Sequence, residues 1–101
     1  MHNPPIQKTS ITLKMLFDAE FLKSGTKLTS KNTMAEATLN EEGAISINYN
    51  GIKKVFTSPS GAARFIEKIN LNGWKYWDVI VNGDTRSLDD YRIEYLEKVI
   101  D

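Results

Sequence analysis

The change of hydrophobic period along the chain is the feature that most constrains its fold. Apolar residues recur with helical spacing over residues 13–21, alternate with polar residues between positions 35 and 57, and return to helical spacing after position 58. Helical spacing indicates an amphipathic helix, and strict alternation indicates a strand with one buried face. A chain of 101 residues with one alternating block between helical segments is therefore predicted to be a single α+β domain.

A first helix is expected after residues 1–9, a segment with two prolines that is interpreted as a flexible lead-in. Ser10 or Thr12 can cap this helix. Its expected buried stripe consists of Leu13, Leu16, Phe17 and Phe21. The helix should end near Leu22, because Gly25 is free to adopt the positive φ that often closes a helix.

The alternating block predicts a small antiparallel meander. Its three runs are residues 35–39, 45–49 and 52–57. A loop at Glu41–Gly43 separates the first two runs, and Asn50–Gly51, a strong hairpin dipeptide, separates the second from the third. Residues 27–30 are expected to add an edge strand to this sheet.

The second half of the chain predicts a helix, a strand and another helix. Ser58 can cap a helix that has Pro59 in its first position and runs to about Ile69. The expected inward residues of this helix are Ala62, Ala63, Ile66 and Ile69. Residues 74–81 are rich in aromatic and β-branched side chains and are predicted to form a strand, which Asn82–Asp84 ends.

A final helix is predicted through Ile100, because Ser87 followed by Asp90 matches a capping-box start. Its apolar stripe consists of Leu88, Tyr91, Tyr95, Leu96 and Val99. The expected organisation is a flexible segment at 1–9, an α+β domain at 10–86, and an acidic amphipathic helix at 87–101 packed on that domain.

The residue chemistry argues against catalysis by this domain. The chain has no cysteine, and its single histidine, His2, lies in the lead-in. Asp89 and Asp90 could suggest a metal pair, but negative charge at a helix N-terminus explains them better. No cofactor and no metal is therefore expected. The longest run of large apolar residues, Val79–Val81, is far shorter than the roughly 20 residues that span a bilayer, so the expected location is the cytoplasm.

Charge is balanced over the whole chain but not along it. Residues 1–86 hold eleven basic and eight acidic residues, whereas residues 87–101 hold two basic and five acidic ones. A net charge of zero excludes a strongly basic surface that would bind nucleic acid through overall charge alone. Residues 1–86, which have the small excess of positive charge, are the part of the chain that could bind a polyanion.

Two separated motifs and a hairpin carry a resemblance to a known family. The motifs are Ser58-Pro59-Ser60-Gly61-Ala62-Ala63 and Asn72-Gly73-Trp74-Lys75-Tyr76-Trp77, and the segments 22–28 and 37–45 agree in the same order. Together they resemble the RAMA domain, the restriction enzyme and adenine methylase associated domain. The resemblance covers about residues 11–80. It implies a small α+β module that accompanies DNA methylases and nucleases and recognises DNA, including DNA with modified bases, without being a catalyst.

Under that reading, the helix that starts at Ser58 is the candidate phosphate site. Its first turn offers free N–H groups and the hydroxyls of Ser58 and Ser60. Arg64 and Lys68 follow Ser60 on the outward face, which Glu67 interrupts, and could track a DNA backbone. The structural alternative is that Ser58 only caps the helix and that Arg64 and Lys68 are solvated surface residues.

The second motif supplies the candidate base contacts. Alternation along a strand would place Trp74 and Tyr76 on one face, beside Lys75, where an exposed ring could stack on a base. The Asn72 amide could pair with an adenine edge. The alternative readings are core tryptophans and a tight turn at Asn72–Gly73. The DNA-binding hypothesis requires that the start of the helix at Ser58 and the segment at residues 72–77 together form one positively charged recess.

The predicted function is therefore a non-catalytic DNA-recognition module, for methylated-base DNA, in a restriction–modification system. The expected partners are DNA, bound weakly by the isolated domain, and a tethered or associated methylase or nuclease. Lysine pairs such as Lys53–Lys54 are further candidates for phosphate contacts. The alternative function is protein interaction, in which the stripe of residues 88–100 docks on a partner chain or forms a homodimer.

Overall fold

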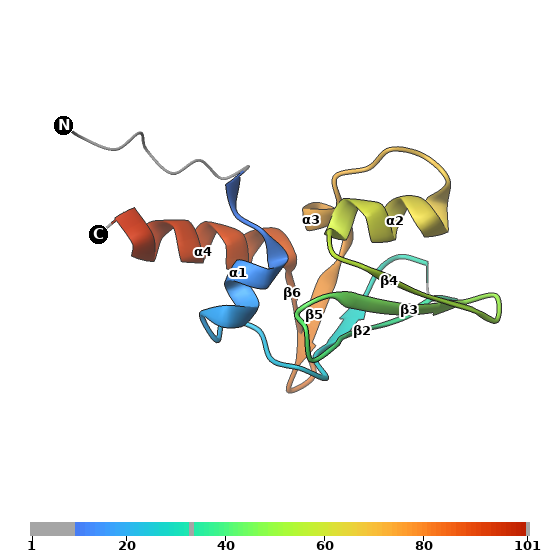
Figure 1. Cartoon of the computed structure of the whole chain (residues 1–101), viewed down its shortest axis with the longest axis horizontal. Coiled ribbons are helices and arrows are strands. Elements are labelled where there is room, and N and C mark those ends of the chain that lie inside the picture. Colours follow the sequence, from blue (N-terminus) through green and yellow to red (C-terminus); the bar gives the residue numbers. More distant parts are fainter. Residues whose placement is uncertain (1–9, 33, 101) are drawn as a thin grey trace.

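The computed structural model describes residues 10–32 and 34–100, without the side chain of Ile100. Within these residues the chain forms an α+β fold of four helices and a six-stranded antiparallel sheet, which confirms the predicted fold class (Figure 1). The expected flexible segment, residues 1–9, lies outside the described residues.

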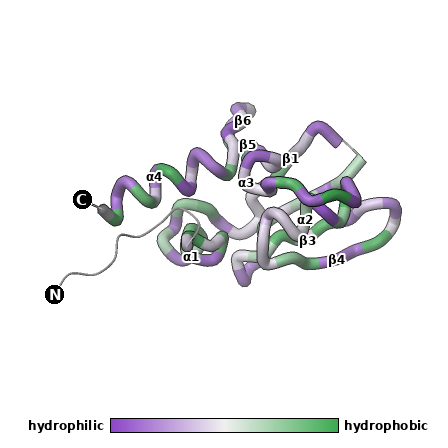
Figure 2. The backbone as a smooth tube through the Cα atoms, turned by 90° about the horizontal axis from the view of Figure 1, so that it is seen from above, coloured by the Kyte–Doolittle hydropathy of each residue, from purple (hydrophilic) through white to green (hydrophobic). Residues whose placement is uncertain are grey.

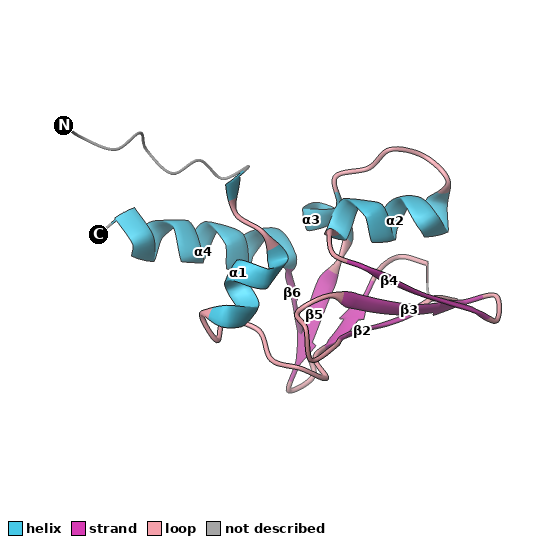
Figure 3. Cartoon of the chain, viewed as in Figure 1, coloured by secondary structure: helices cyan, strands magenta, loops and turns pink. Residues whose placement is uncertain are grey.

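The elements follow the predicted order, with two additions described below. They are α1 (Leu13–Asp18), β1 (Lys27–Thr29), β2 (Glu36–Leu39), β3 (Ile45–Tyr49), β4 (Ile52–Phe56), α2 (Pro59–Glu67), α3 (Gly73–Tyr76), β5 (Asp78–Val81), β6 (Asp84–Ser87) and α4 (Leu88–Ile100). Figure 3 shows α2 and α3 above the sheet and α1 with α4 beside one end of it. The capping predicted at Thr12 and Ser58 is present, since each side chain accepts a backbone N–H of the first helical turn.

The strand order is β4-β3-β2-β1-β5-β6, and all neighbouring strands are antiparallel. The prediction that residues 27–30 form an edge strand is wrong, because β1 pairs with β2 on one side and with β5 on the other. Leu28 is opposite Ala37 in one pairing and Val79 in the other. All three side chains are buried, so β1 is part of the core.

The core lies between one face of the sheet and the helices. Ile45 and Ile47 of β3 are buried on the same face as Ala37 and Leu39 of β2, as the predicted alternation requires. From α2, the predicted inward residues Ala62, Ala63 and Ile66 are buried. The opposite face of the sheet carries the partly or fully exposed row formed by Thr38, Ser46 and Val55.

The first helix is shorter than predicted and ends at Asp18. Glu20 adopts a φ of 65°, and the N–H of Phe21 donates to the carbonyl of Leu16 while that of Glu20 donates to Phe17. This pair of bonds is a Schellman C-cap, with Glu20 in the position that glycine usually holds. Phe21 therefore packs beyond the helix, against Tyr95 of α4 in a T-shaped contact.

The second helix also stops early, because Lys68 takes a left-handed φ of 66° at its C-cap. Ile69 then falls outside the helix and is 60% exposed, so its predicted inward placement is wrong. The loop that joins α2 to α3 arches over α2 (Figure 3).

The predicted strand at residues 74–81 is wrong in its first half. Residues 73–76 form the short helix α3, capped by the Asn72 side chain, and only residues 78–81 form a strand. Trp74 within this helix and Trp77 at its C-cap are both buried. Aromatic residues favour strands in general, but here packing decides their conformation.

Asn82 and Gly83 end β5 as predicted, but they also begin a hairpin that the sequence pattern did not reveal. Both have positive φ, 52° and 84°, as a two-residue hairpin turn requires. The returning strand β6 pairs along the whole of β5. Its polar sequence has no alternation, so pairing alone defines it as a strand.

The final helix is confirmed, with the Ser87 hydroxyl accepting the N–H of Asp90 at its start. Leu88 of the predicted stripe is buried, and Tyr91, Tyr95 and Leu96 pack against the core. Val99 is 42% exposed. Figure 2 shows hydrophilic and hydrophobic residues alternating along this helix. None of the helices in the described residues has the length and apolar character that a membrane crossing demands.

Candidate functional site

The start of α2 is joined to the start of α3 by direct backbone contact. A Cβ placed on Gly73 would lie 2.0 Å from the carbonyl carbon of Pro59, so the two backbones touch. The N–H of Gly73 donates to the Ser60 hydroxyl (3.0 Å), and the indole N–H of Trp77 donates to the Pro59 carbonyl (3.1 Å). The two resemblance motifs therefore form one packed junction.

The serine hydroxyls of this junction are already used inside the protein. Ser58 accepts the N–H of Gly61 at 3.0 Å and thereby caps α2, while Ser60 accepts the N–H of Gly73. Asn72 does the same for α3, since its side-chain oxygen accepts the N–H of Trp74 at 3.1 Å. These three side chains position the helices, and the nitrogen end of the exposed Asn72 amide remains available as a donor.

Arg64 lies on the exposed side of α2, one turn beyond Ser60. Its guanidinium donates to the neutral side chain of Asn70 at 3.4 Å and has no ion pair with a described carboxylate. Asn72 precedes Gly73, whose N–H donates to Ser60 one turn before Arg64. Lys75 of α3 is exposed.

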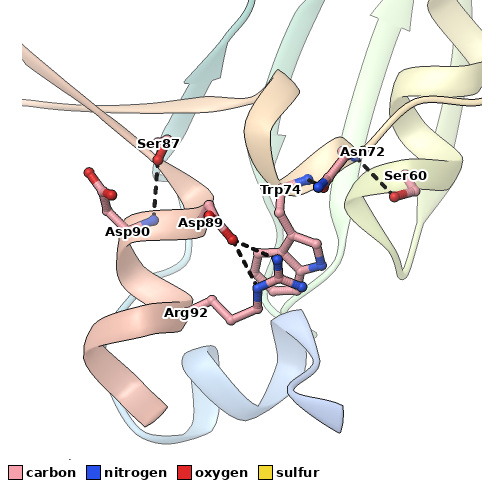
Figure 4. A network of polar contacts seen from close by, with 8 residues as sticks. Ser60, Asn72, Trp74, Ser87, Asp89, Asp90 and Arg92 are labelled. Atoms are coloured by element: carbon pink, nitrogen blue, oxygen red, sulfur yellow. Dashed lines mark hydrogen bonds and ion pairs between the residues drawn. The ribbon is translucent and has the colours of Figure 1, made fainter. Parts of the chain in front are cut away.

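Trp74 is covered by α4 and is not the exposed ring that the sequence predicted. Only 9% of it is exposed, and the guanidinium carbon of Arg92 lies 4.4 Å from its ring centroid. Arg92 in turn donates to one carboxylate oxygen of Asp89 at 2.6 and 3.1 Å (Figure 4). The indole face that could have stacked on a base is therefore occupied by a buried ion pair.

The expected recess exists in altered form. Trp74 and the start of α2 line a common pocket of about 480 Å³, whose other walls come from residues 11–14 and 42–44. The prediction that it is cationic is wrong. Lys14 is ion-paired with Asp18 at 3.1 Å, Glu42 also lines the pocket, and neither Arg64 nor Lys75 does.

Tyr76 links three parts of the chain instead of lying free beside Trp74. Its hydroxyl donates to Glu67 of α2 at 2.6 Å and lies 3.2 Å from the Ser30 hydroxyl. Burial, together with the bond to the Glu67 carboxylate, raises the pKa of Tyr76 to about 12. The ring packs edge-on against Trp77. Tyr76 therefore holds α3 against α2 and the end of β1.

Ion pairs engage only some of the charged side chains of the described residues. These pairs involve α1, β6 and α4; they are Lys14–Asp18, Arg86–Asp90, Arg86–Glu94 and Arg92–Asp89. None involves Arg64, Lys68 or Lys75, the cations of α2, its C-cap and α3. The acidic residues of the last helix are thus largely occupied by nearby arginines. The cations of α2 and α3 have no described carboxylate as an ion-pair partner, which is also true of Lys23, Lys53 and Lys98 elsewhere on the molecule.

Two groups in the site were not recognised from the sequence. Asp89 was interpreted as helix-terminal charge only, whereas it holds Arg92 three residues later, a spacing that places both on one side of a helix. The partnership of Glu67 with Tyr76 joins separate elements, so no local pattern signals it. Within the described residues there is no group of three or more histidine, cysteine or acidic side chains that could hold a metal ion.

The sequence of this chain is similar to that of known proteins. A family model described as Restriction Enzyme Adenine Methylase Associated, RAMA, matches residues 2–100, which include α4. The chain is also 29% identical over 90 residues to the type II methyltransferase M.HinfI of Haemophilus influenzae. That alignment covers 89% of this chain but 24% of the methyltransferase, so the chain spans about a quarter of this relative.

Proposed function

The chain belongs to the RAMA family, and from this membership we propose that it is a non-catalytic DNA-recognition module of a restriction–modification system, directed at DNA with methylated bases. The observation that carries the proposal concerns the cations of α2 and α3, the elements that hold the two family motifs. Arg64 and Lys75 are exposed and have no ion pair with a described carboxylate. Exposed cations without an ion-pair partner are available to bind the phosphates of a DNA backbone.

The proposed contacts fall into two groups. Arg64 and Lys75 bind phosphates, and the free amide nitrogen of Asn72 donates to a base edge. Ser58, Ser60, Trp74 and Tyr76 support this surface from inside, because their polar atoms or rings are engaged with other parts of the chain. Support of this kind fixes the junction of α2 and α3 and so the spacing of the groups that touch DNA.

The module is expected to bind weakly by itself. With only a few phosphate contacts its affinity should fall steeply as salt rises. The chain covers 24% of its methyltransferase relative. We therefore propose that a linked or associated methylase or nuclease supplies a second contact with the same DNA, which raises the effective concentration of the module at its site.

A titration with matched DNA duplexes tests this function. The duplexes are identical in sequence and are either unmodified, methylated on adenine or methylated on cytosine, and each is titrated at two salt concentrations. The expected result is weak binding that is stronger at low salt and stronger for one methylated duplex. Undetectable binding to all three duplexes at low salt would sink the proposal.

Charge reversal separates DNA binding from protein interaction. Arg64→Glu should abolish retention of the duplex, and Lys23→Glu, which changes an exposed cation in the loop after α1, is the matched control. The competing function is dimerisation through α4. If Arg64→Glu leaves DNA retention unchanged while Tyr95→Asp dissolves a dimer, protein interaction is the correct function.

A further inference from the structure

Two lysines from different elements converge on Phe65. The Lys54 ammonium of β4 lies 5.2 Å from the centroid of the Phe65 ring, and that of Lys68, the C-cap residue of α2, lies 5.3 Å from the same centroid. The Phe65 ring packs against the rings of Phe56 and Tyr49, whose centroids lie 5.4 and 6.3 Å from its own. Phe65 is thus packed against two other rings and has a lysine ammonium from each of two elements beside it.

The positive charges of these two lysines are not neutralised by a carboxylate within the described part of the chain. Neither Lys54 nor Lys68 forms an ion pair there. A ring face attracts each ammonium, and the C-terminal end of α2 favours the charge on Lys68. Elsewhere, the Lys98 ammonium lies 5.1 Å from the centroid of the Phe21 ring, with no second lysine of the described residues over that ring.

The backbone at Lys68 gives a second indication. Its φ of 66° is in the left-handed region, where glycine ends a helix without steric cost and a lysine does not. The chain therefore has a less favourable residue at the C-cap of α2. The side chain of this residue is one of the two over Phe65, a contact that glycine could not make.

We propose that Lys54 and Lys68 bind phosphates of the duplex DNA backbone, with Phe65 as the ring against which both side chains lie. The site lies at the C-terminal end of the helix that carries Arg64, so one strand of DNA can contact both along α2. This inference rests on the proposed function, because it names a further contact surface for the same DNA. Lys53 pairs with Asn48 on the opposite face of the sheet and is not part of the site.

Salt dependence of binding measures the contact. The full chain and its Lys54→Gln, Lys68→Gly and doubly substituted variants are titrated with one DNA duplex over a range of salt concentrations. Each lysine that contacts a phosphate contributes about 0.9 to the slope of log affinity against log salt. Each single variant should therefore lower that slope by about one, and the double variant by about two. Lys98→Gln is the matched control, since it removes a lysine of α4 whose ammonium likewise lies over a phenylalanine ring, that of Phe21.

The Lys68→Gly variant keeps the test independent of folding. Glycine relieves the left-handed backbone, so this variant should unfold at the same or a higher denaturant concentration than the parent while it binds DNA less tightly. If the parent binds the duplex but both single variants keep its salt slope, the phosphate site is wrong and the DNA-binding function stands. If the parent binds no duplex, the function fails first. Tighter binding to an RNA duplex of the same length would overturn the assignment to DNA.

Discussion

Arg92 of α4 covers the ring of Trp74 in α3, with its guanidinium carbon 4.4 Å from the ring centroid. The same guanidinium is held by Asp89 at 2.6 Å, and both charged residues are only 7% exposed. A cation over a desolvated indole is worth about 2 kcal/mol, and the carboxylate fixes its position. The contact therefore fastens the last helix to the junction of the two family motifs.

Removal of the carboxylate should be costly. Asp89→Ala leaves the Arg92 charge buried without this carboxylate, and loss of one member of a buried pair costs about 3–5 kcal/mol. We expect the free energy of unfolding, measured by urea denaturation, to fall by about that amount. The exposed neighbour Asp90 is the control, because Asp90→Ala should cost no more than about 1 kcal/mol. Equal losses for the two variants would show that the buried pair is not special.

Gly73 should tolerate no side chain. A Cβ at this position would lie 2.0–2.2 Å from backbone atoms of Pro59 and Ser60, which cannot move away as a flexible side chain could. Gly73→Ala should therefore separate α3 from α2 and destabilise the fold by at least about 3 kcal/mol. Gly83→Ala is the comparison, because Gly83 has open space around it and only its φ of 84° is strained. That variant should lose about 1–2 kcal/mol. Thermal unfolding of both proteins contradicts this account if Gly73→Ala is the milder change.

Ser60 should matter for stability more than its place on an exposed helix turn suggests. Ser60→Ala leaves the N–H of buried Gly73 without the hydroxyl that accepts it, which costs about 1–3 kcal/mol. Ser58→Ala removes an N-cap and should cost about 1 kcal/mol. Denaturant unfolding and DNA titration of the two variants together show whether the hydroxyl is structural. A Ser60→Ala protein with parental stability and weakened DNA binding would assign Ser60 to the phosphate contact instead.

The parts of this fold that could be predicted from sequence are those with local signals. Turn dipeptides, N-caps and alternation predicted the meander β2–β4 and both long helices. The places where prediction was wrong are those where tertiary contact overrode propensity. Aromatic residues at 74–77 favour a strand in isolation, but residues 73–76 form a helical turn that Asn72 caps and that packs on Pro59 through Gly73.

The candidate site was predicted less well than the fold, for the same reason. The cations could be identified by residue type, and Arg64 and Lys75 are exposed as a DNA contact requires. Trp74 is buried under Arg92, which follows it by 18 residues in the sequence. This burial depends on how α4 packs against α3, which no local pattern encodes. The pairing of Lys54 with Lys68 around Phe65 likewise depends on the packing of α2 on β4.

Tyr76 should make stability fall at high pH. Its pKa in the folded protein is about 12, against an ordinary value of 10.0, because burial and the Glu67 carboxylate disfavour the tyrosinate. A group whose folded-state pKa is raised contributes stability that is fully present below the unfolded value. That stability is lost as pH rises from about 10 towards 12, since the unfolded chain releases the proton first.

The comparison of the parent with Tyr76→Phe isolates this contribution, because lysines and the other tyrosines titrate in both proteins. The free energy of unfolding is measured in urea at several pH values from neutral to about 12. Tyr76→Phe should be less stable than the parent near neutral pH, where the bond to Glu67 is intact, and the gap should narrow above pH 10. A gap that stays constant over this range would mean that the Tyr76 hydroxyl titrates as an ordinary exposed tyrosine, and the proposed link between α3 and α2 would then be wrong.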